Sequence, residues 1–282
     1  MHRTRSHFTH PGLIFAVTVV VTFSILLPVQ AECPTPTIFQ TSLLEKNQPG
    51  IEITTAEIQQ ILNSVSMPVF DVRFPLEFAI SHIPSAINIP PENNTSADSE
   101  VRQIAALFPN PNDSNARFVL TCNGPSCGKS KRVAAALIAA GYNKDNIFRY
   151  QLGLPVWRAL GNTVQTDIEG FAYIFNRDET AVFVDARAQQ DFRADTVTCA
   201  VNIQPGEATA ANDDGRLPLW DKGARVVVFA DDAHVAKQVA AEIAKKAYWS
   251  SSYFGGTFTN CKTIRRFTST AHAVAAMACN EG

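Results

Sequence analysis

The sequence predicts an α/β protein made of two similar units, each a mainly parallel sheet flanked by helices. Short apolar runs alternate with helical stretches, which is typical of parallel strands joined by crossover helices. A second observation is an internal repeat, because an apolar run ending in Asp71-Val-Arg73 recurs as one ending in Asp185-Ala-Arg187. The third is composition: 46% hydrophobic and 18% charged residues are ordinary for a globular protein with a core.

The two copies of the repeat run in register along the chain. Asp71 and Asp185 are 114 residues apart, and so are Asn88 and Asn202. Later apolar strands also correspond, and each is followed by an Ala-rich helical stretch, at residues 132–140 and 235–246. The polar, non-periodic residues 161–169 are the expected linker. We therefore expect one domain over residues 47–163, a second over 168–268, and a helical C-terminal tail over 269–282.

The N-terminus resembles a secretory signal peptide. Arg3 and Arg5 precede an uncharged run over residues 13–29, and Ala31 offers a cleavage position before Glu32. We expect residues 1–31 to be a signal peptide, with an uncleaved membrane anchor as the alternative. The protein is then exported, in a bacterium to the periplasm, or is held at the membrane if the segment stays uncleaved.

Charge excludes some function classes. Lys and Arg number 24 against 26 Asp and Glu, so the chain has neither a disordered acidic composition nor the basic excess of a nucleic-acid binder. The spacing of its His, Cys, Asp and Glu residues predicts no metal site. Export makes disulfides possible among the six cysteines.

The segment from Phe118 to Val133 is the most informative in the chain. An apolar strand ends at Cys122, a loop rich in Gly and Pro follows, and a helix is expected to begin near Ser130. Free amides of the loop and the helix dipole favour an anion at that place, so a cysteine there is expected to have a lowered pKa. Lys129 and Lys131 add positive charge, and Arg149 is a candidate to reach the loop from the next strand end.

Four motifs occur in order from residue 70 to residue 157. They are Phe70-Asp-Val-Arg-Phe-Pro-Leu-Glu-Phe78, Ser81-His-Ile-Pro-Ser-Ala-Ile-Asn-Ile89, Gly141-Tyr142 and Leu152-Gly-Leu-Pro-Val-Trp157. Together with the cysteine loop they resemble the rhodanese (thiosulfate sulfurtransferase) family, and the repeat makes the chain similar to a tandem member of that family.

The resemblance implies sulfurtransferase chemistry without a cofactor. A cysteine takes sulfane sulfur from an anionic donor such as thiosulfate, holds it as a persulfide and passes it to cyanide or a thiol. The family places this cysteine directly after the central strand, which here is Cys122. The expected anion-binding residues are those of the loop: Asn123, Gly124, Ser126, Gly128, Lys129 and Ser130.

The loop also departs from the family pattern. Lys129-Ser130 comes two positions late, and a second cysteine, Cys127, lies inside the loop. Cys127 is either a resolving thiol or a rival nucleophile. The alternative function is a non-catalytic binding or thiol-redox module in which Cys122 and Cys127 form a disulfide.

Four further residues of the first unit are expected to support the site. Asp71 and Arg73 are predicted to form a buried ion pair that ties the sheet edge to the loop. His82 is predicted to be a structural cap, and Trp157 to lie in the core.

The second unit keeps the scaffold and loses the thiol. Ala230 takes the place of the cysteine, and Asp231-Asp232 would repel an anionic donor. We predict an inactive domain in which Cys199 and Cys261 are the better candidates for a structural disulfide, with Cys33 or Cys279 as possible substitutes for either partner.

Two other functions fail on spacing. The run Gly124-Pro-Ser-Cys-Gly-Lys-Ser130 is one residue too short for a nucleotide-binding P-loop. A cysteine phosphatase of this fold needs an arginine six positions after the cysteine, where Gly128 stands.

Overall fold

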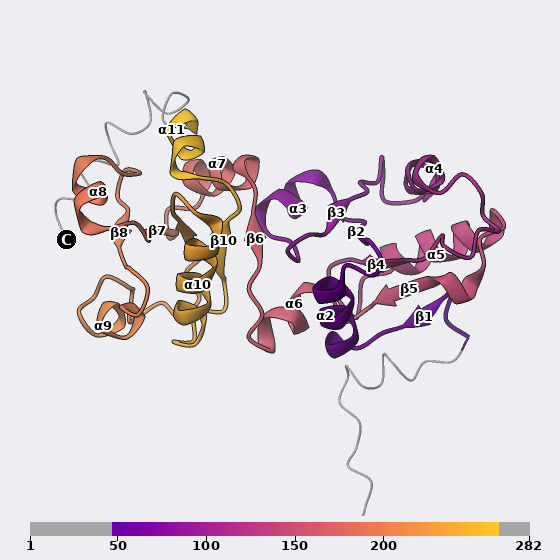
Figure 1. Ribbon diagram of the computed structural model, residues 1–282, viewed down its shortest axis with the longest axis horizontal. Coiled ribbons are helices and arrows are strands. Elements are labelled where there is room, and N and C mark those ends of the chain that lie inside the picture. The colour runs from indigo at the N-terminus through magenta and orange to yellow at the C-terminus, as the bar shows by residue number, and fades with distance from the viewer. Residues whose placement is uncertain (1–46, 265–282) are drawn as a thin grey trace, which may run out of the picture. The chain divides into compact units, whose positions relative to one another are not determined.

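The computed structural model describes residues 47–264, which belong to one compact unit. They form two five-stranded parallel sheets (Figure 1). The strand order is β1-β5-β4-β2-β3 in the first sheet and β6-β10-β9-β7-β8 in the second, so the second sheet repeats the topology of the first. The α/β fold class and the tandem arrangement predicted from the sequence are confirmed. The segment 1–31, the tail 269–282, Cys33 and Cys279 lie outside the described residues.

The first sheet contains short strands with buried side chains at its centre. Its strands are β1 (Ile51–Glu52), β2 (Val69–Asp71), β3 (Ile87–Asn88), β4 (Phe118–Thr121) and β5 (Ile147–Tyr150). The helices between them are α2 (Thr55–Ser64), α3 (Pro75–Ile80), α4 (Asp98–Leu107), α5 (Lys129–Ala139) and α6 (Gly153–Ala159), with a 3-10 turn, η1 (Lys144–Asn146). Every residue of β2 and β4 is buried, which matches their unbroken apolar runs.

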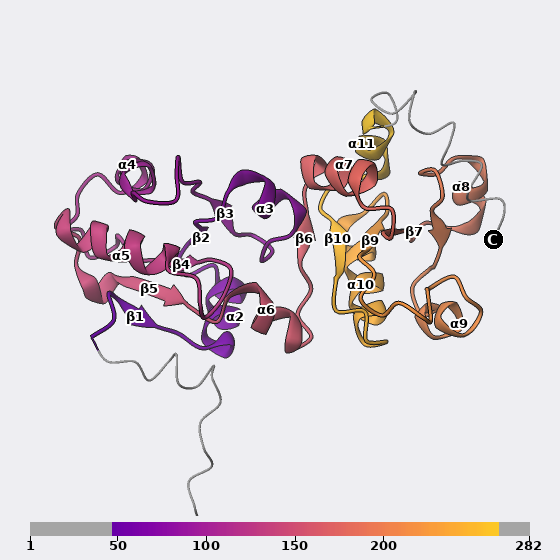
Figure 2. The same cartoon turned by 180° about the vertical axis from the view of Figure 1, so that it is seen from behind.

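Helices cover both faces of this sheet, as Figures 1 and 2 show from opposite sides. On one face Ile104 of α4 and Leu137 of α5 pack with Phe118 and Leu120. On the other face Ile58 of α2 and Trp157 of α6 pack with Val119. Alternate side chains of the buried strand β4 thus belong to two separate cores, one on each face of the sheet.

The second sheet is built in the same way. Its strands are β6 (Gln165–Thr166), β7 (Val182–Asp185), β8 (Val201–Asn202), β9 (Val226–Phe229) and β10 (Ser251–Phe254), and its helices are α7 (Ile168–Arg177), α8 (Gln189–Ala194), α9 (Ala208–Asp213), α10 (Ala233–Ala244) and α11 (Phe258–Ile264). Small side chains of α9 and α10 fill one core, and aromatic side chains of α7 and α11 fill the other.

The expected linker differs from the structure. Residues 165–166 within it form β6, which pairs in parallel with β10 at the edge of the second sheet. A two-residue edge strand is held by backbone hydrogen bonds, so it leaves no apolar periodicity in the sequence. The domain boundaries at residues 163 and 168 stay predictions.

The repeat is visible in hydrogen bonds as well as in sequence. The Asn88 side-chain amide donates to the carbonyls of Asp71 and Arg73, both at 2.9 Å. Asn202 donates in the same way to the carbonyls of Asp185 and Arg187, at 2.8 and 2.9 Å. Each Asn therefore ties the edge strand to the turn that follows the neighbouring strand.

None of the helices within residues 47–264 is long and apolar enough to cross a membrane.

Candidate active site

The cysteine loop lies at the carboxyl edge of the first sheet. Strand β4 is the central strand, between β5 and β2, and it ends at Thr121, directly before Cys122. Helix α5 begins at Lys129, one residue before the predicted start, with Gly128 as its N-cap. The loop 122–128 therefore meets the N-terminus of an 11-residue helix, where backbone N–H groups and the helix dipole favour negative charge.

The loop holds two free thiols in contact with each other. Cys122 is 1% exposed, whereas Cys127 is partly exposed. The two thiols share a hydrogen bond, and the Cys122 Sγ also lies 3.7 Å from Ser130 Oγ and 3.6 Å from the Cys127 carbonyl. The backbone N–H groups of Lys129 and Asn123 donate to the Cys127 thiolate.

The two thiols differ in acidity. The hydrogen bond from Cys122 lowers the pKa of Cys127 to about 6; burial opposes this, and the Lys129 and Asn123 amides and the Lys129 charge add to it. The pKa of Cys122 is raised, because this thiol holds its proton to donate to Cys127 and because it is buried. The lowered pKa expected at Cys122 thus occurs at Cys127. The expectation was wrong in position mainly because Cys122 donates the hydrogen bond that the two thiols share. Backbone amides reach both sulfurs, since those of Lys129 and Asn123 contact Cys127 and that of Ser130 contacts Cys122.

Gln151 organises the loop, and sequence reasoning missed it. Its side chain, 1% exposed, lies just beyond β5. The amide nitrogen lies within hydrogen-bond distance of the carbonyls of Gly124, Pro125 and Cys127, at 3.1, 3.0 and 3.0 Å. The amide oxygen accepts from Ser130 Oγ at 3.0 Å. One side chain thereby ties three backbone carbonyls of the loop together. The only sequence signal was a polar residue at a strand end.

Arg149 acts behind Gln151 rather than in the loop. Its guanidinium is fully buried, forms an ion pair with Glu52 at 2.8 Å and donates to the Gln151 amide oxygen at 2.7 Å. This arginine orients Gln151, so it does not reach the anion position that the sequence suggested for it.

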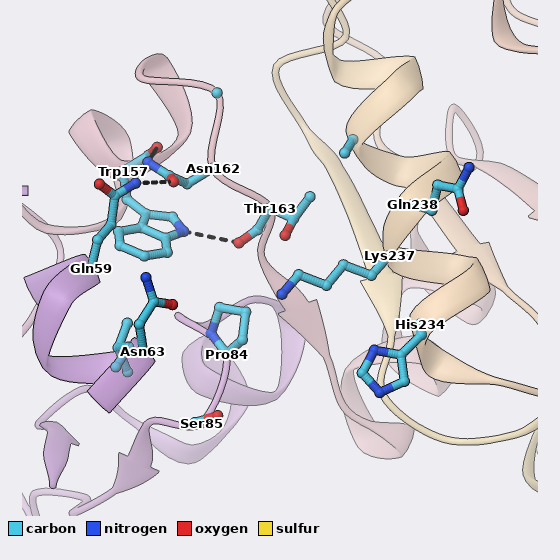
Figure 3. A pocket seen from close by; sticks show the side chains of 13 residues that line it. Gln59, Asn63, Pro84, Ser85, Trp157, Asn162, Thr163, His234, Lys237 and Gln238 are labelled. Carbon is cyan, nitrogen blue, oxygen red and sulfur yellow. Dashed lines mark hydrogen bonds between the residues drawn. The ribbon is translucent and has the colours of Figure 1, made fainter. Parts of the chain in front are cut away.

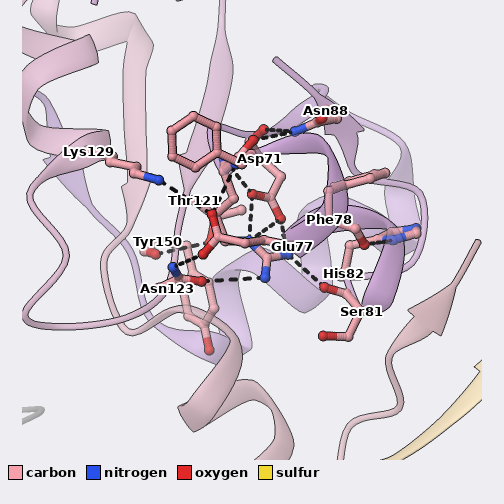
Figure 4. A network of polar contacts seen from close by, with 12 residues as sticks. Asp71, Glu77, Phe78, Ser81, His82, Asn88, Thr121, Asn123, Lys129 and Tyr150 are labelled. Carbon is pink, nitrogen blue, oxygen red and sulfur yellow. Dashed lines mark hydrogen bonds and ion pairs between the residues drawn. The ribbon is translucent and has the colours of Figure 1, made fainter. Parts of the chain in front are cut away.

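A second network holds the loop from the side of β2 (Figure 4). Asp71 and Arg73 form a buried ion pair, and Arg73 also donates to the Asn123 side-chain oxygen at 3.5 Å and to the Ser81 carbonyl at 2.7 Å. Asn123 in turn donates to Glu77 at 2.7 Å. The ion pair therefore lies where the sequence placed it and extends to the residue after Cys122.

Glu77 is a further residue to which the sequence pattern assigned no role. It accepts from Asn123 and, at 3.4 Å, from Lys129. Burial opposes its ionisation, but hydrogen bonds from Asn123 and the Phe74 N–H, and the charge of Lys129, outweigh burial and lower its pKa. Lys129, whose ammonium also lies 4.0 Å from the centre of the Phe74 ring, is thus held beside the loop by a carboxylate.

Gly153 explains the glycine of the last motif. It has φ +62°, and a Cβ there would lie 2.5 Å from the Gly124 nitrogen and 2.6 Å from the Cys122 carbonyl oxygen. The start of α6 therefore touches the loop backbone, and only glycine permits this approach. Of the other loop residues, Ser126 and Gly128 are exposed, whereas Gly124 and Ser130 are buried.

His82 and Trp157 lie in structural positions. The His82 Nδ1 is 2.9 Å from the Phe78 carbonyl, its ring stacks on Phe78, and burial lowers its pKa. Its backbone pairs with Gln165 at the edge of the second sheet. Trp157 is 6% exposed and donates to the Thr163 carbonyl at 2.9 Å.

Two cavities differ in their relation to the loop. One, of about 540 Å³, is lined by Asn123 and by three arginines, Arg73, Arg158 and Arg225. Burial and the charges of the other two arginines lower the pKa of Arg158 to about 10. A larger cavity, of about 910 Å³, is lined by Trp157 and Lys237 and by no residue of the loop 122–128 (Figure 3). The smaller cavity lies beside the loop through Asn123, although neither thiol lines it, and its three arginines outnumber its one carboxylate, Glu77.

The second sheet lacks a thiol at the matching place. Strand β9 ends at Phe229, and the buried Ala230 follows where Cys122 follows β4. Asp232 caps α10 by accepting from the His234 N–H. The Asp185–Arg187 ion pair is retained at 2.7 Å. The helix N-terminus that faces a thiol in the first sheet faces a carboxylate here.

The cysteines of the second domain are arranged differently from the prediction. Cys261 is a free, buried thiol whose pKa burial raises to about 12. Cys199 is disulfide-bonded, whereas Cys261 is not. The predicted Cys199–Cys261 pair is therefore wrong, because Cys261 turns into the aromatic core around Phe171 and Phe229.

Within residues 47–264 no three His, Cys, Asp or Glu side chains gather as a metal site requires.

Residues 54–160 match the family model for a Rhodanese-like domain. No curated protein matches the sequence.

Solved structures with a similar chain path are distant in sequence. They include thiosulfate sulfurtransferase from Pseudomonas aeruginosa (18% identity, 73% of this chain and 43% of that chain, TM-score 0.33). A 3-mercaptopyruvate sulfurtransferase from Leishmania major (12%, 78% and 76%, TM-score 0.29) and the rhodanese-like domain of an Anabaena protein (16%, 42% and 80%, TM-score 0.32) are others. This chain spans less than half of the Pseudomonas protein.

Proposed function

We propose that this chain, whose residues 54–160 form a rhodanese-like domain, is a sulfurtransferase that carries sulfane sulfur as a cysteine persulfide in the loop 122–130. One observation carries the proposal: a thiol pair at the carboxyl edge of the central strand, with backbone amides and a lysine around the acidic sulfur. A thiolate stabilised in this way attacks a sulfane donor at neutral pH, and the same amides stabilise the persulfide anion that results.

Charge supports an anionic donor such as thiosulfate. Lys129 lies beside the loop, and Arg158 and Arg225 line the adjoining cavity. Cationic groups beside a partly dry cavity raise the local concentration of small anions. The acceptor is a thiol or cyanide, and the chemistry needs only the sulfur atoms of the loop. The second domain is inactive in this proposal, because Ala230 cannot hold sulfur.

Mass spectrometry tests the proposal. The reduced protein is incubated with thiosulfate and then analysed intact, where one bound sulfur atom adds about 32 Da. Cys122→Ser and Cys127→Ser are compared with Cys261→Ser, the matched control in which a buried thiol outside the loop is removed. The function predicts uptake in the control and loss in the variant that lacks the carrier. The proposal fails if no form of the protein takes sulfur from thiosulfate or another sulfane donor.

The second candidate function is a binding or thiol-redox module. The contact between Cys122 and Cys127 favours it, since two thiols five residues apart in hydrogen-bond contact are able to form a disulfide. Such a module exchanges its disulfide with a partner thiol and takes up no sulfur. A protein that shows rapid disulfide exchange and no mass gain would establish this function instead.

Export is part of the proposal and depends on the sequence alone. Arg3, Arg5 and the apolar residues 13–29 support a cleaved signal peptide and a periplasmic location, with a membrane anchor as the alternative. N-terminal sequencing of the protein from its host tests cleavage. A first residue of Glu32 is expected, and an intact Met1 in the membrane fraction would establish the anchor.

A further inference from the structure

Sulfur carriage needs one thiol, but the loop contains two in direct contact. Their environments are unequal. Cys122 is 1% exposed beneath the loop, with Ser130 Oγ and the Cys127 carbonyl beside its sulfur. Cys127 is partly exposed and receives the amides of Asn123 and Lys129. The thiol of Cys127 is therefore open to solutes, whereas the thiol of Cys122 is buried beside it.

Access decides which thiol meets the donor. A dissolved donor has to align with the attacking sulfur, and the Cys122 sulfur lies under the loop that Gln151 holds in place. Cys127 stands next to Gly128 and Ser126, both exposed, and its thiolate is stabilised by the charge of Lys129. These surroundings favour Cys127 over Cys122 as the sulfur that attacks an anionic donor.

Contact between the two sulfurs decides the fate of the bound sulfur. A persulfide has an inner sulfur, bonded to carbon, and an outer sulfur. Cys122 touches the Sγ of Cys127, which becomes the inner sulfur once sulfur is bound. Attack on the inner sulfur expels the outer one, whereas attack on the outer sulfur would only move it to Cys122.

We infer that Cys127 takes up the sulfane sulfur and that Cys122 then attacks the Cys127 Sγ, releasing hydrosulfide and leaving a Cys122–Cys127 disulfide. This inference rests on the proposed function and extends it from sulfur transfer to sulfide release. A dithiol compound or a dithiol protein then reduces the disulfide, so the complete cycle converts thiosulfate and a dithiol into sulfite, sulfide and a disulfide.

The steps balance in atoms and electrons. In the first, the Cys127 thiolate bonds to the sulfane sulfur, the sulfur–sulfur bond of thiosulfate breaks, and sulfite leaves with the electron pair. In the second, the Cys122 sulfur bonds to the Cys127 Sγ, the persulfide bond breaks, and the outer sulfur leaves as hydrosulfide with the Cys122 proton. In the third, the dithiol gives two electrons and two protons to the protein disulfide and becomes a disulfide itself.

The surroundings of Cys122 suit this order of events. While Cys127 is a thiolate, Cys122 holds its proton in order to donate to it, and so cannot act as a nucleophile. Once Cys127 bears sulfur, its Sγ is no longer charged, and that demand on the Cys122 proton ends. The backbone N–H of Ser130 remains as a donor to a Cys122 thiolate. Sulfur uptake at one thiol thereby releases the other to react.

A single-turnover experiment without any reductant tests the inference. Reduced protein is mixed with thiosulfate, and sulfite, sulfide and intact mass are followed together. The wild type is expected to release sulfite and sulfide in equal amounts and to end about 2 Da lighter than the reduced form, as a disulfide. Cys122→Ser is expected to release sulfite, to keep about 32 Da of bound sulfur, and to lose sulfide release at least about tenfold.

The remaining variants separate the possible failures. Cys127→Ser is expected to release neither product, and Cys261→Ser to behave as the wild type. Cys122→Ala repeats the test with a side chain that needs no hydrogen bond, in case serine disturbs the fold. If Cys127→Ser takes up sulfur and Cys122→Ser does not, or if the wild type keeps its persulfide, the inference is overturned and the sulfurtransferase function stands. If no form releases sulfite, both fail.

Discussion

Replacing Gln151 by leucine gives the sharpest test of how the loop is held. The leucine matches the buried volume of the glutamine but removes an amide that contacts three loop carbonyls and accepts from Ser130 and Arg149. Each buried polar group left without a partner costs about 1–3 kcal/mol. Relaxation of the loop recovers part of this cost, so we expect Gln151→Leu to reduce the free energy of unfolding by about 3 kcal/mol.

Two measurements check this expectation. Urea unfolding gives the stability change, and the rate of Cys127 alkylation, located by peptide mass mapping, reports the state of the loop. When these three carbonyls lose their shared partner, the loop relaxes, and the amides that stabilise the Cys127 thiolate lose their alignment. Alkylation at neutral pH should therefore slow, because the pKa of Cys127 returns toward that of an ordinary thiol, about 8.5.

Gln103 provides the matched control. Its amide is half-buried in the same domain and donates to the carbonyls of Pro90, at 2.9 Å, and Ser99, at 3.2 Å, away from the cysteines. Gln103→Leu should cost about 1 kcal/mol and leave alkylation of Cys127 unchanged. The reasoning is refuted if Gln151→Leu unfolds at the wild-type urea concentration, or if it loses stability while Cys127 reacts as before.

Three other perturbations have defined outcomes. The rate of sulfur uptake should rise with pH through about 6, where the pKa of Cys127 lies, and stay level above it, because only the thiolate attacks. Cys122→Ala should move the midpoint of this pH profile upward by about one to two pH units. An unmoved midpoint would show that the hydrogen bond from Cys122 does not cause the lowered pKa of Cys127. Gly153→Ala should reduce the free energy of unfolding, measured with urea, by more than about 2 kcal/mol. Gly161 is also at positive φ but has open space around it, so Gly161→Ala should cost about 1 kcal/mol. Equal losses would show that the loop does not pack against Gly153. Ala230→Cys should produce a thiol in the second domain that alkylates at least about tenfold more slowly than Cys127 at neutral pH. Equal rates would contradict the electrostatic reason for the inactivity that we propose for this domain.

The sequence by itself determined the two parallel sheets and their tandem arrangement. Apolar runs such as residues 118–121 are buried on both faces in the structure, and this burial leaves a pattern in the sequence. The repeat placed Asp71 and Asp185 at equivalent strand ends, and the strand orders confirm their equivalence. Strand β6 escaped prediction because two residues that pair only through their backbone leave no such pattern.

Tertiary structure decided the properties of the site. The sequence located the cysteine loop at a strand end and favoured Cys122 as the reactive sulfur, since that residue directly follows the strand, with Cys127 as the alternative. Which thiol reacts stays a prediction. Which thiol holds the charge depends on the hydrogen bond that Cys122 donates to Cys127 and on the surrounding amides, two of which contact Cys127 and one of which, that of Ser130, contacts Cys122. Gln151 enters the loop from another strand, 24 residues beyond Cys127. Spacing along a chain encodes local elements, whereas the direction of an N–H group or a buried amide is set only when distant strands pack together.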